Sequence, residues 1–165
     1  MYTGYAAFNG PFVIRYPRGK GEMKDWRNEM QVLPIGKGKK LCDGDDIAVL
    51  SIGPIGNEVI KAIEMVKEEG VSIAHYDMIY LKPLDEELLH EIGQKYNRII
   101  TVENGVIKGG FGSAVLEFMA DNGYTPHVKR IGVPDAFIEH GSIPELYQLC
   151  GMDAESIAKQ LKKEN

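Results

Sequence analysis

Residues 47–77 read IAVLSIGPIGNEVIKAIEMVKEEGVSIAHYD, and this stretch predicts one strand–helix–strand unit. It opens with an apolar, β-branched run that ends at Gly53 and Pro54, which is typical of a buried strand. Apolar residues then recur at the spacing of one helix face, before Gly70: Val59, Ile60, Ile63 and Val66. A second run of strand type covers residues 71–77. A helix between two such strands predicts a parallel α/β sheet.

The same alternation continues to the end of the chain. Further elements are expected at these places: strands at 98–104 and 127–133, a short first strand around 35–41, and helices after Pro83, at 113–123, at 144–151 and at 153–165. Asp153 is expected to cap the last helix. The predicted fold is a three-layer α/β domain, with helices on both faces of a mostly parallel sheet of about five strands.

The first part of the chain follows a different pattern. FVIRY, residues 12–16, predicts a buried strand that runs into Pro17. Residues 19–46 are charged, broken by glycine and proline and weakly periodic, which indicates a connector. We therefore expect residues 1–35 to be a short remnant of a second domain with its linker, and residues 36–165 to be the α/β domain.

Composition narrows the classes of function. The 165 residues are 44% hydrophobic and 26% charged, which suits one globular core. The net charge is −5 and the charges are interleaved, so nucleic acid is not an expected partner. A membrane span needs about 18 apolar residues, and no run approaches this length. The spacing of Cys42 and Cys150 is not that of a zinc site or of a disulfide framework. We expect a cytoplasmic protein that does not enter a membrane.

Arg18 is the first candidate for ligand binding. An arginine can hold a phosphate through two hydrogen bonds and stays charged near neutral pH. Pro17 fixes the turn before Arg18, and Gly19 lets a ligand or a neighbouring backbone come close. The alternative is a surface arginine paired with a carboxylate, and the pattern alone leaves both open.

The glycine-rich turn GGFGSA, residues 109–114, leads from a predicted strand into a predicted helix. Such a turn can offer free N–H groups to a phosphate, as in dinucleotide-binding proteins. Gly110 and Gly112 match the first two glycines of that fingerprint, but Val115 stands at the third. Asp135, beyond the next strand, could serve as the ribose acid. Because the match is partial, we favour a structural turn.

Polar residues at the carboxyl ends of the predicted strands are further candidates, because open α/β sheets bind ligands there. Asp77 and the pair Glu103 and Asn104 hold such positions. For isolated carboxylates of this kind we favour helix capping or a loop hydrogen bond. His75 lies inside an apolar strand and is predicted to be a core histidine with a hydrogen-bond partner.

The loop PDAFIEHG, residues 134–141, carries Asp135, Glu139 and His140. A histidine–carboxylate pair in this loop could do acid–base work. Because no nucleophile is evident nearby, we favour a hydrogen bond that stabilises the loop. His90 and His127 belong to no metal-ligand spacing.

In their order, these motifs resemble the carboxyl-terminal end of the 1-deoxy-D-xylulose-5-phosphate synthases, a family of the transketolase superfamily. The resemblance rests on these stretches: MYTGY, IRYPRG, LPIGKG, KPLDEELL, TVENGVIKGGFGSAVLE, GVPDAFIEHG and LYQLCGMDAESIAKQL. RYPRG before LPIGKG, and PDAFIEHG near the end, are specific to this family rather than to transketolases at large. The resemblance implies a transketolase-like C-terminal domain at residues 36–165, with residues 1–35 as the end of a middle, pyrimidine-binding domain.

The function that the resemblance implies belongs to the full-length enzyme. That enzyme is a homodimeric transferase that joins pyruvate to D-glyceraldehyde 3-phosphate with loss of CO2, on the way to isoprenoids, thiamine and pyridoxal. Its cofactors are thiamine diphosphate and Mg²⁺. By the same resemblance, Arg18 helps to bind the phosphate of glyceraldehyde 3-phosphate. Asn104 and Gly105 depart from the acidic pair that usually follows TVE in the family.

The family's diphosphate and metal motif, its catalytic histidines and its activating glutamate all belong to upstream domains. We therefore expect no catalytic, cofactor-binding or metal-binding residue in this chain. Alone it is expected to be inactive and to serve in domain packing and dimerisation.

Two other functions compete with this one. The first is a free-standing nucleotide-binding or oligomerisation module of α/β type that uses the turn at residues 109–112. The incomplete glycine fingerprint argues against it. The second is an enzyme of the related dehydrogenase or transketolase branches. Those branches can share GGFG, but we do not expect them to share RYPRG or PDAFIEHG.

Overall fold

The structure is a computed structural model, and it describes residues 1–17 and 27–162. The chain divides into two compact units, Met1–Ile35 and Gly36–Asn165. The identification of the first unit as the end of a pyrimidine-binding domain stays a prediction. The second unit contains the sheet.

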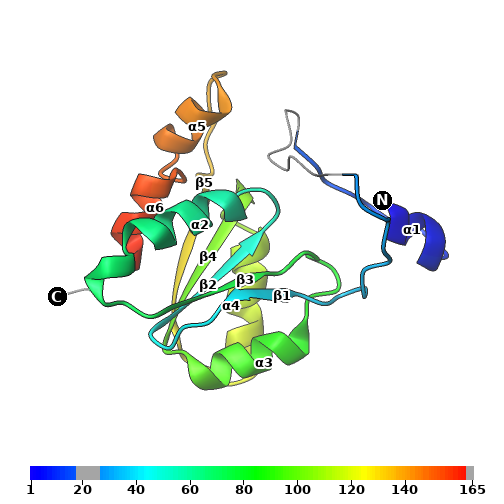
Figure 1. Cartoon of the computed structure of the whole chain (residues 1–165), viewed down its shortest axis with the longest axis horizontal. Helices are drawn as coiled ribbons and strands as arrows, with labels where there is room; N and C mark the ends of the chain where they lie inside the picture. Colours follow the sequence, from blue (N-terminus) through cyan, green and yellow to red (C-terminus); the bar gives the residue numbers. More distant parts are fainter. Residues whose placement is uncertain (18–26, 163–165) are drawn as a thin grey trace. The chain divides into compact units, whose positions relative to one another are not determined.

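A five-stranded sheet with the strand order β1-β3-β2-β4-β5 forms the centre of the second unit (Figure 1). Its strands are β1 (Lys39–Cys42), β2 (Ile47–Ile52), β3 (Ile73–Asp77), β4 (Arg98–Val106) and β5 (His127–Val133). Strands β2 to β5 run parallel, whereas β1 pairs antiparallel with β3 at one edge. The prediction of a mostly parallel sheet of about five strands is confirmed.

Helices cover both faces of this sheet. The helices of this unit are α2 (Gly56–Met65), α3 (Glu86–Lys95), α4 (Phe111–Asp121), α5 (Ile143–Leu149), α6 (Ala154–Leu161) and the short 3-10 helix η1 (Lys67–Glu69). Val49 packs with α2 and α6 in one buried cluster, and Leu50 packs with α3 and α4 in another. Successive strand residues point to opposite faces, so these clusters lie on opposite sides of the sheet. Figure 1 shows α2 and α6 on one side of the sheet and α3 on the other. The predicted three layers are confirmed.

The ends of the helices follow signals in the sequence. Asp153 caps α6, because its carboxylate accepts a hydrogen bond from Ser156 N at 3.1 Å. Gly70 follows η1 with a φ of 72°, in the left-handed region that favours glycine. Asp85 caps α3 by accepting from Leu88 N, and its other oxygen accepts from Gly38 N at 2.9 Å. Asp85 therefore fixes the start of the second unit to α3.

The predicted buried strand at residues 12–16 is wrong. These residues form no strand, and Val13 is 94% exposed. A strand needs a neighbour that pairs with its N–H and C=O groups, and the described residues of Met1–Ile35 include no strand. The unit instead contains a short helix, α1 (Tyr2–Ala7). Phe12 packs so closely on this helix that a Cβ at Gly4 would lie 2.7 Å from its ring.

Two smaller predictions also need correction. The first strand is Lys39–Cys42, later than the expected residues 35–41, because an edge strand extends only where β3 pairs with it. Ile60 was expected to face the core, but it is 46% exposed, whereas Ala62 is fully buried. In a helix Ile60 lies at the side of the stripe that Val59 and Ala62 share, so it falls outside the buried face.

Among the described residues, no helix has both the length and the apolar character that crossing a membrane requires.

Candidate functional site at the carboxyl edge of the sheet

The order of the parallel strands reverses between β2 and β4, which are neighbours although α2, β3 and α3 separate them in the sequence. Open α/β sheets bind ligands at such a point, outside the carboxyl ends of the strands. Ile52 of β2 pairs there with Glu103 of β4. Glu103 is therefore the polar residue at the position where this fold would offer a binding site.

The carboxylate of Glu103 is bound by the chain's own backbone. Its Oε2 accepts a hydrogen bond from Phe111 N at 2.9 Å, and its Oε1 accepts one from Gly112 N at 2.8 Å. Glu103 is only 5% exposed. Both donors belong to the first turn of α4, whose free N–H groups a phosphate would need. An internal carboxylate fills this position, so the helix capping that we favoured for Glu103 is confirmed.

The glycines of the turn make room for this carboxylate. A Cβ at Gly110 would overlap Glu103 Oε2 and the carbonyl oxygen of Val106. A Cβ at Gly112 would lie 2.5 Å from Thr101 Oγ1. The glycine-rich sequence thus serves close packing between β4 and α4, which confirms the interpretation as a structural turn.

Arg130 holds the same turn from β5. Its Nη1 donates to the carbonyl oxygen of Ile107 at 2.9 Å and to Ser113 Oγ at 2.7 Å. Ser113 Oγ in turn donates to the carbonyl oxygen of Ile107 at 3.1 Å. The sequence does not single out Arg130, because alternation along a strand gives the face of a side chain but not its partner.

Asp77, at the end of β3, stabilises the loop that follows. Its Oδ1 accepts a hydrogen bond from Ile79 N at 3.1 Å. Ile79 has a φ of 55°, in a region that β-branched residues rarely adopt, so this bond supports an unfavourable backbone conformation. Burial raises the pKa of Asp77. The loop hydrogen bond predicted for Asp77 is confirmed.

Asp135, Glu139 and His140 do not form a cluster. Asp135 Oδ2 lies 3.2 Å from Lys108 Nζ, and both side chains are more than half exposed, so this ion pair contributes little to stability. Glu139 and His140 are exposed, and within the described part of the chain no hydrogen bond joins them. The loop-stabilising hydrogen bond that we favoured for this stretch stays a prediction. Ile138 of this stretch is half-buried, whereas its neighbour Glu139 is exposed.

Ile138 contributes to an apolar hollow beside the carboxyl edge. The hollow has a volume of about 190 Å³, and its lining is Asn104, Val133, Ile138, Ile143, Leu146, Tyr147, Cys150 and Met152. Asn104 Nδ2 donates to Tyr147 OH at 3.1 Å. Pockets for drug-sized ligands begin at about 300 Å³, so this hollow is too small for a nucleotide.

His75 and Ser51 form a polar pair inside the core. The distance between Ser51 Oγ and His75 Nε2 is 2.8 Å, and the two residues are 0% and 1% exposed. No substrate can reach them, so the prediction of a core histidine with a hydrogen-bond partner is confirmed. Burial lowers the pKa of His75 to about 4.

This pair predicts how stability depends on pH. A histidine in an unfolded chain has a pKa of about 6.5, so the unfolded state binds a proton first as the pH falls. The free energy of unfolding should therefore fall as the pH drops below about 6.5, until His75 is protonated in the folded state too. We expect a loss of about 2 kcal/mol between about pH 7 and about pH 5. Urea unfolding followed by circular dichroism measures it. The control His75→Gln should have a flatter profile, and equal slopes would contradict the assignment.

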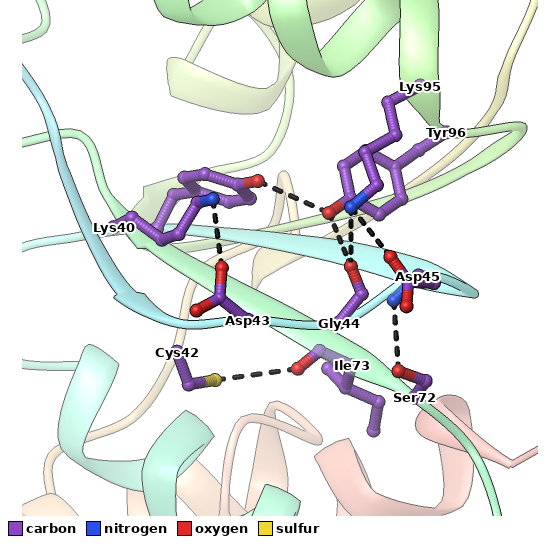
Figure 2. A network of polar contacts seen from close by, with 10 residues as sticks. Lys40, Cys42, Asp43, Gly44, Asp45, Ser72, Ile73, Lys95 and Tyr96 are labelled. Carbon is purple, nitrogen blue, oxygen red and sulfur yellow. Dashed lines mark hydrogen bonds and ion pairs between the residues drawn. The ribbon is translucent and has the colours of Figure 1, made fainter.

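A second polar network lies at the opposite edge of the sheet, around the turn between β1 and β2 (Figure 2). Lys95 Nζ and Tyr96 OH both donate to the carbonyl oxygen of Gly44, at 3.0 Å and 2.7 Å. Lys95 Nζ also lies 2.7 Å from Asp45, a bond that raises the pKa of Lys95 and lowers that of Asp45. These donors and acceptors satisfy one another. The network therefore fixes the turn and does not form a ligand site.

The remaining candidates lie apart from these clusters. His90 Nδ1 is 2.9 Å from Tyr124 OH, and His127 is exposed at the start of β5. The part of the chain that the structure describes contains no group of three or more histidine, cysteine, aspartate or glutamate residues that could hold a metal ion. Arg18 lies outside the described residues, so its predicted phosphate contact stays a prediction.

The family profile and the curated proteins that match this chain all belong to the transketolase type. The family profile described as "Transketolase, C-terminal domain" matches residues 36–157. Over its whole length the chain is 98% identical to a 1-deoxy-D-xylulose-5-phosphate synthase of Parabacteroides distasonis, of which it covers 26%. It is 60% identical to the synthase of Bacteroides thetaiotaomicron, with 99% of this chain and 26% of that protein covered. The chain thus spans about a quarter of the length of the curated relatives that it matches.

Solved structures agree with the fold. One is described as a split gene transketolase, inactive beta4 tetramer. It has a TM-score of 0.71 and 31% identity, and the match covers 81% of this chain and 45% of that one. A transketolase from Campylobacter jejuni has a TM-score of 0.57 at 13% identity over 76% of this chain and 18% of that one, which supports the fold alone.

Proposed function

We propose that this chain forms the carboxyl-terminal part of a 1-deoxy-D-xylulose-5-phosphate synthase. The chain belongs to the transketolase C-terminal domain family, which supports this proposal. The observation that carries this proposal is the 98% identity to such a synthase over the whole chain. The full-length enzyme is then a transferase of the isoprenoid pathway. It condenses pyruvate with D-glyceraldehyde 3-phosphate, releases CO2 and also feeds thiamine and pyridoxal synthesis.

Thiamine diphosphate supplies the carbanion chemistry in this proposal, with Mg²⁺ as its companion ion. The described residues do not fit either group. The N–H groups at the start of α4 are occupied by Glu103, and these residues offer no metal-binding cluster. We therefore assign the cofactors to the rest of the polypeptide and derive no catalytic step from this chain.

The role left for this chain is structural, in domain packing and in a cytoplasmic homodimer. Residues 1–35 are the end of the middle domain in this proposal, and Arg18 contacts the phosphate of glyceraldehyde 3-phosphate. The relative described as an inactive beta4 tetramer supports the view that such a chain alone is inactive. A free-standing nucleotide-binding module is not favoured, because Glu103 already occupies the anion position of the glycine-rich turn.

A segment exchange tests this function. These 165 residues would replace the matching segment of the Bacteroides thetaiotaomicron synthase, to which they are 60% identical. We expect the hybrid to form 1-deoxy-D-xylulose 5-phosphate from pyruvate and glyceraldehyde 3-phosphate at a rate within about tenfold of the parent. This chain alone is expected to be inactive. A hybrid that folds and dimerises like the parent but makes no product would refute the proposal.

Arg18 is tested in the same hybrid. Arg18→Ala should raise the KM for glyceraldehyde 3-phosphate by about tenfold or more, because a charged hydrogen bond to phosphate is lost, and should leave the KM for pyruvate unchanged. Arg27→Ala is the matched control. Equal changes in both KM values would mean that Arg18 supports the fold and does not bind the phosphate.

A further inference from the structure

The chain contains three Asn–Gly steps: Asn9–Gly10, Asn104–Gly105 and Asn122–Gly123. An asparagine before glycine can lose its side-chain amide without an enzyme, because glycine has no Cβ to hinder attack by its backbone nitrogen. The reaction needs an asparagine side chain that can turn toward this nitrogen, and it needs a mobile backbone. The structure distinguishes the three steps on both requirements.

Asn104 and Asn122 are both held. Asn104 lies in β4, and its Nδ2 donates to Tyr147 OH at 3.1 Å. Asn122 follows α4, where its Nδ2 donates to the carbonyl oxygen of Phe118 at 2.9 Å. The N–H of Gly123 is also engaged, because it donates to the carbonyl oxygen of Ala120 at 3.1 Å. Attack at either position therefore requires the local structure to open first.

Asn9 and Gly10 lie in the turn between Phe8 and Phe12. The two phenylalanine rings contact each other edge to face, with centroids 5.5 Å apart, and so bring the two ends of this turn together. Asn9 and Gly10 are both exposed. Among the described residues, no hydrogen bond holds the Asn9 side chain or the Gly10 N–H. Asparagine and glycine are common in turns, and exposed turn tips are the mobile parts of a chain.

We propose that Asn9 is a deamidation site of this protein. The Gly10 nitrogen forms a bond to Asn9 Cγ, the bond from Cγ to Nδ2 breaks, and ammonia leaves with the proton that the Gly10 nitrogen gives up. One water molecule then opens the five-membered imide at either carbonyl and leaves aspartate or isoaspartate. Water is the only co-reactant, and no group is oxidised or reduced. Each deamidation replaces the neutral Asn9 side chain by a carboxylate and so adds one negative charge. The inference concerns this chain of 165 residues, in which Asn9 is exposed.

Peptide mapping by mass spectrometry tests the proposal. The folded chain is incubated at mildly alkaline pH in water enriched in oxygen-18, so that each event adds one heavy oxygen. We expect the peptide with Asn9 to be labelled about a hundredfold faster than the peptide with Asn104, because a residue of a central strand is rarely open. Asn9→Gln should abolish the fast labelling, and the control Asn122→Gln should retain it.

Unfolding provides the second arm. In concentrated urea the three Asn–Gly steps should react at rates within about tenfold of one another, since structure no longer protects two of them. The proposal fails if Asn104 or Asn122 is labelled as fast as Asn9 in the folded chain. It also fails if Asn9 keeps its lead of about a hundredfold in urea, because sequence and not structure would then set the rates.

Discussion

Replacing Gly44 by alanine is expected to lower the free energy of unfolding of the chain by about 3 kcal/mol or more. Gly44 lies in the turn between β1 and β2, directly against the backbone of β3. A Cβ at this position would lie 2.6 Å from Ile73 N and would overlap the carbonyl carbon of Ile73 and the nitrogen of Ala74. Backbone atoms of a central strand cannot move aside as the end of a flexible side chain can, so the turn itself would have to shift.

The turn is poorly able to shift, because bonds hold it on several sides (Figure 2). The carbonyl oxygen of Gly44 accepts hydrogen bonds from Lys95 and Tyr96. Asp45 N donates to Ser72 Oγ at 3.0 Å, and Cys42 Sγ donates to the carbonyl oxygen of Ile73 at 3.4 Å. A movement of the turn that relieved the overlap would lengthen these hydrogen bonds. The loss of stability in Gly44→Ala therefore includes the weakening of these bonds.

Urea unfolding of Gly44→Ala, followed by far-UV circular dichroism, measures the expected loss. Gly141→Ala is the matched control, because a Cβ there meets only side chains, Leu146 at 3.2 Å and Glu145 Oε2 at 3.6 Å. The control should change the free energy of unfolding by less than about 1 kcal/mol. If the two variants unfold at the same urea concentration, Gly44 is not packed against β3 as described.

The sequence predicts those parts of the fold whose signals are local. β2 is followed by Gly53, β5 lies between Pro126 and Pro134, and both are rich in β-branched residues, so these limits follow from the sequence. The strand predicted at residues 12–16 has the same local signals and is wrong, because pairing with a neighbour decides whether such a run becomes a strand. Local pattern therefore predicts the core of the second unit better than the first unit.

The candidate site depends on contacts that the sequence does not encode locally. Glu103 was recognisable as a residue at the end of a strand, but its two donors lie eight and nine residues further along the chain. Arg130 comes from another strand altogether. The partners of these side chains follow from the order of the strands, which sequence pattern leaves open. The sequence thus locates this edge of the sheet. That the Glu103 carboxylate occupies the N–H groups at the start of α4 is known only from the structure.

Glu103→Ala is expected to lower the free energy of unfolding by about 3 kcal/mol, because it leaves two buried backbone donors without an acceptor. These donors are Phe111 N and Gly112 N, whose partner is a buried carboxylate. Glu103→Gln should cost less, about 1–2 kcal/mol, since the amide oxygen can accept one bond while the amide nitrogen faces a second donor. We therefore expect Glu103→Ala to be the least stable, Glu103→Gln to be intermediate and the wild type to be the most stable. This order is expected when a carboxylate caps a helix.

Hydrogen exchange separates this cap from a general loss of stability. In Glu103→Ala the amides at the start of α4 should exchange much faster than those of α2, which packs on the opposite face. Glu117→Ala, an exposed carboxylate on the same helix, is the control and should stay within about 0.5 kcal/mol of the wild type. A stable Glu103→Ala variant that binds inorganic phosphate at α4 would show instead that the carboxylate only blocks an anion site. The turn would then be a latent binding site and not a structural element.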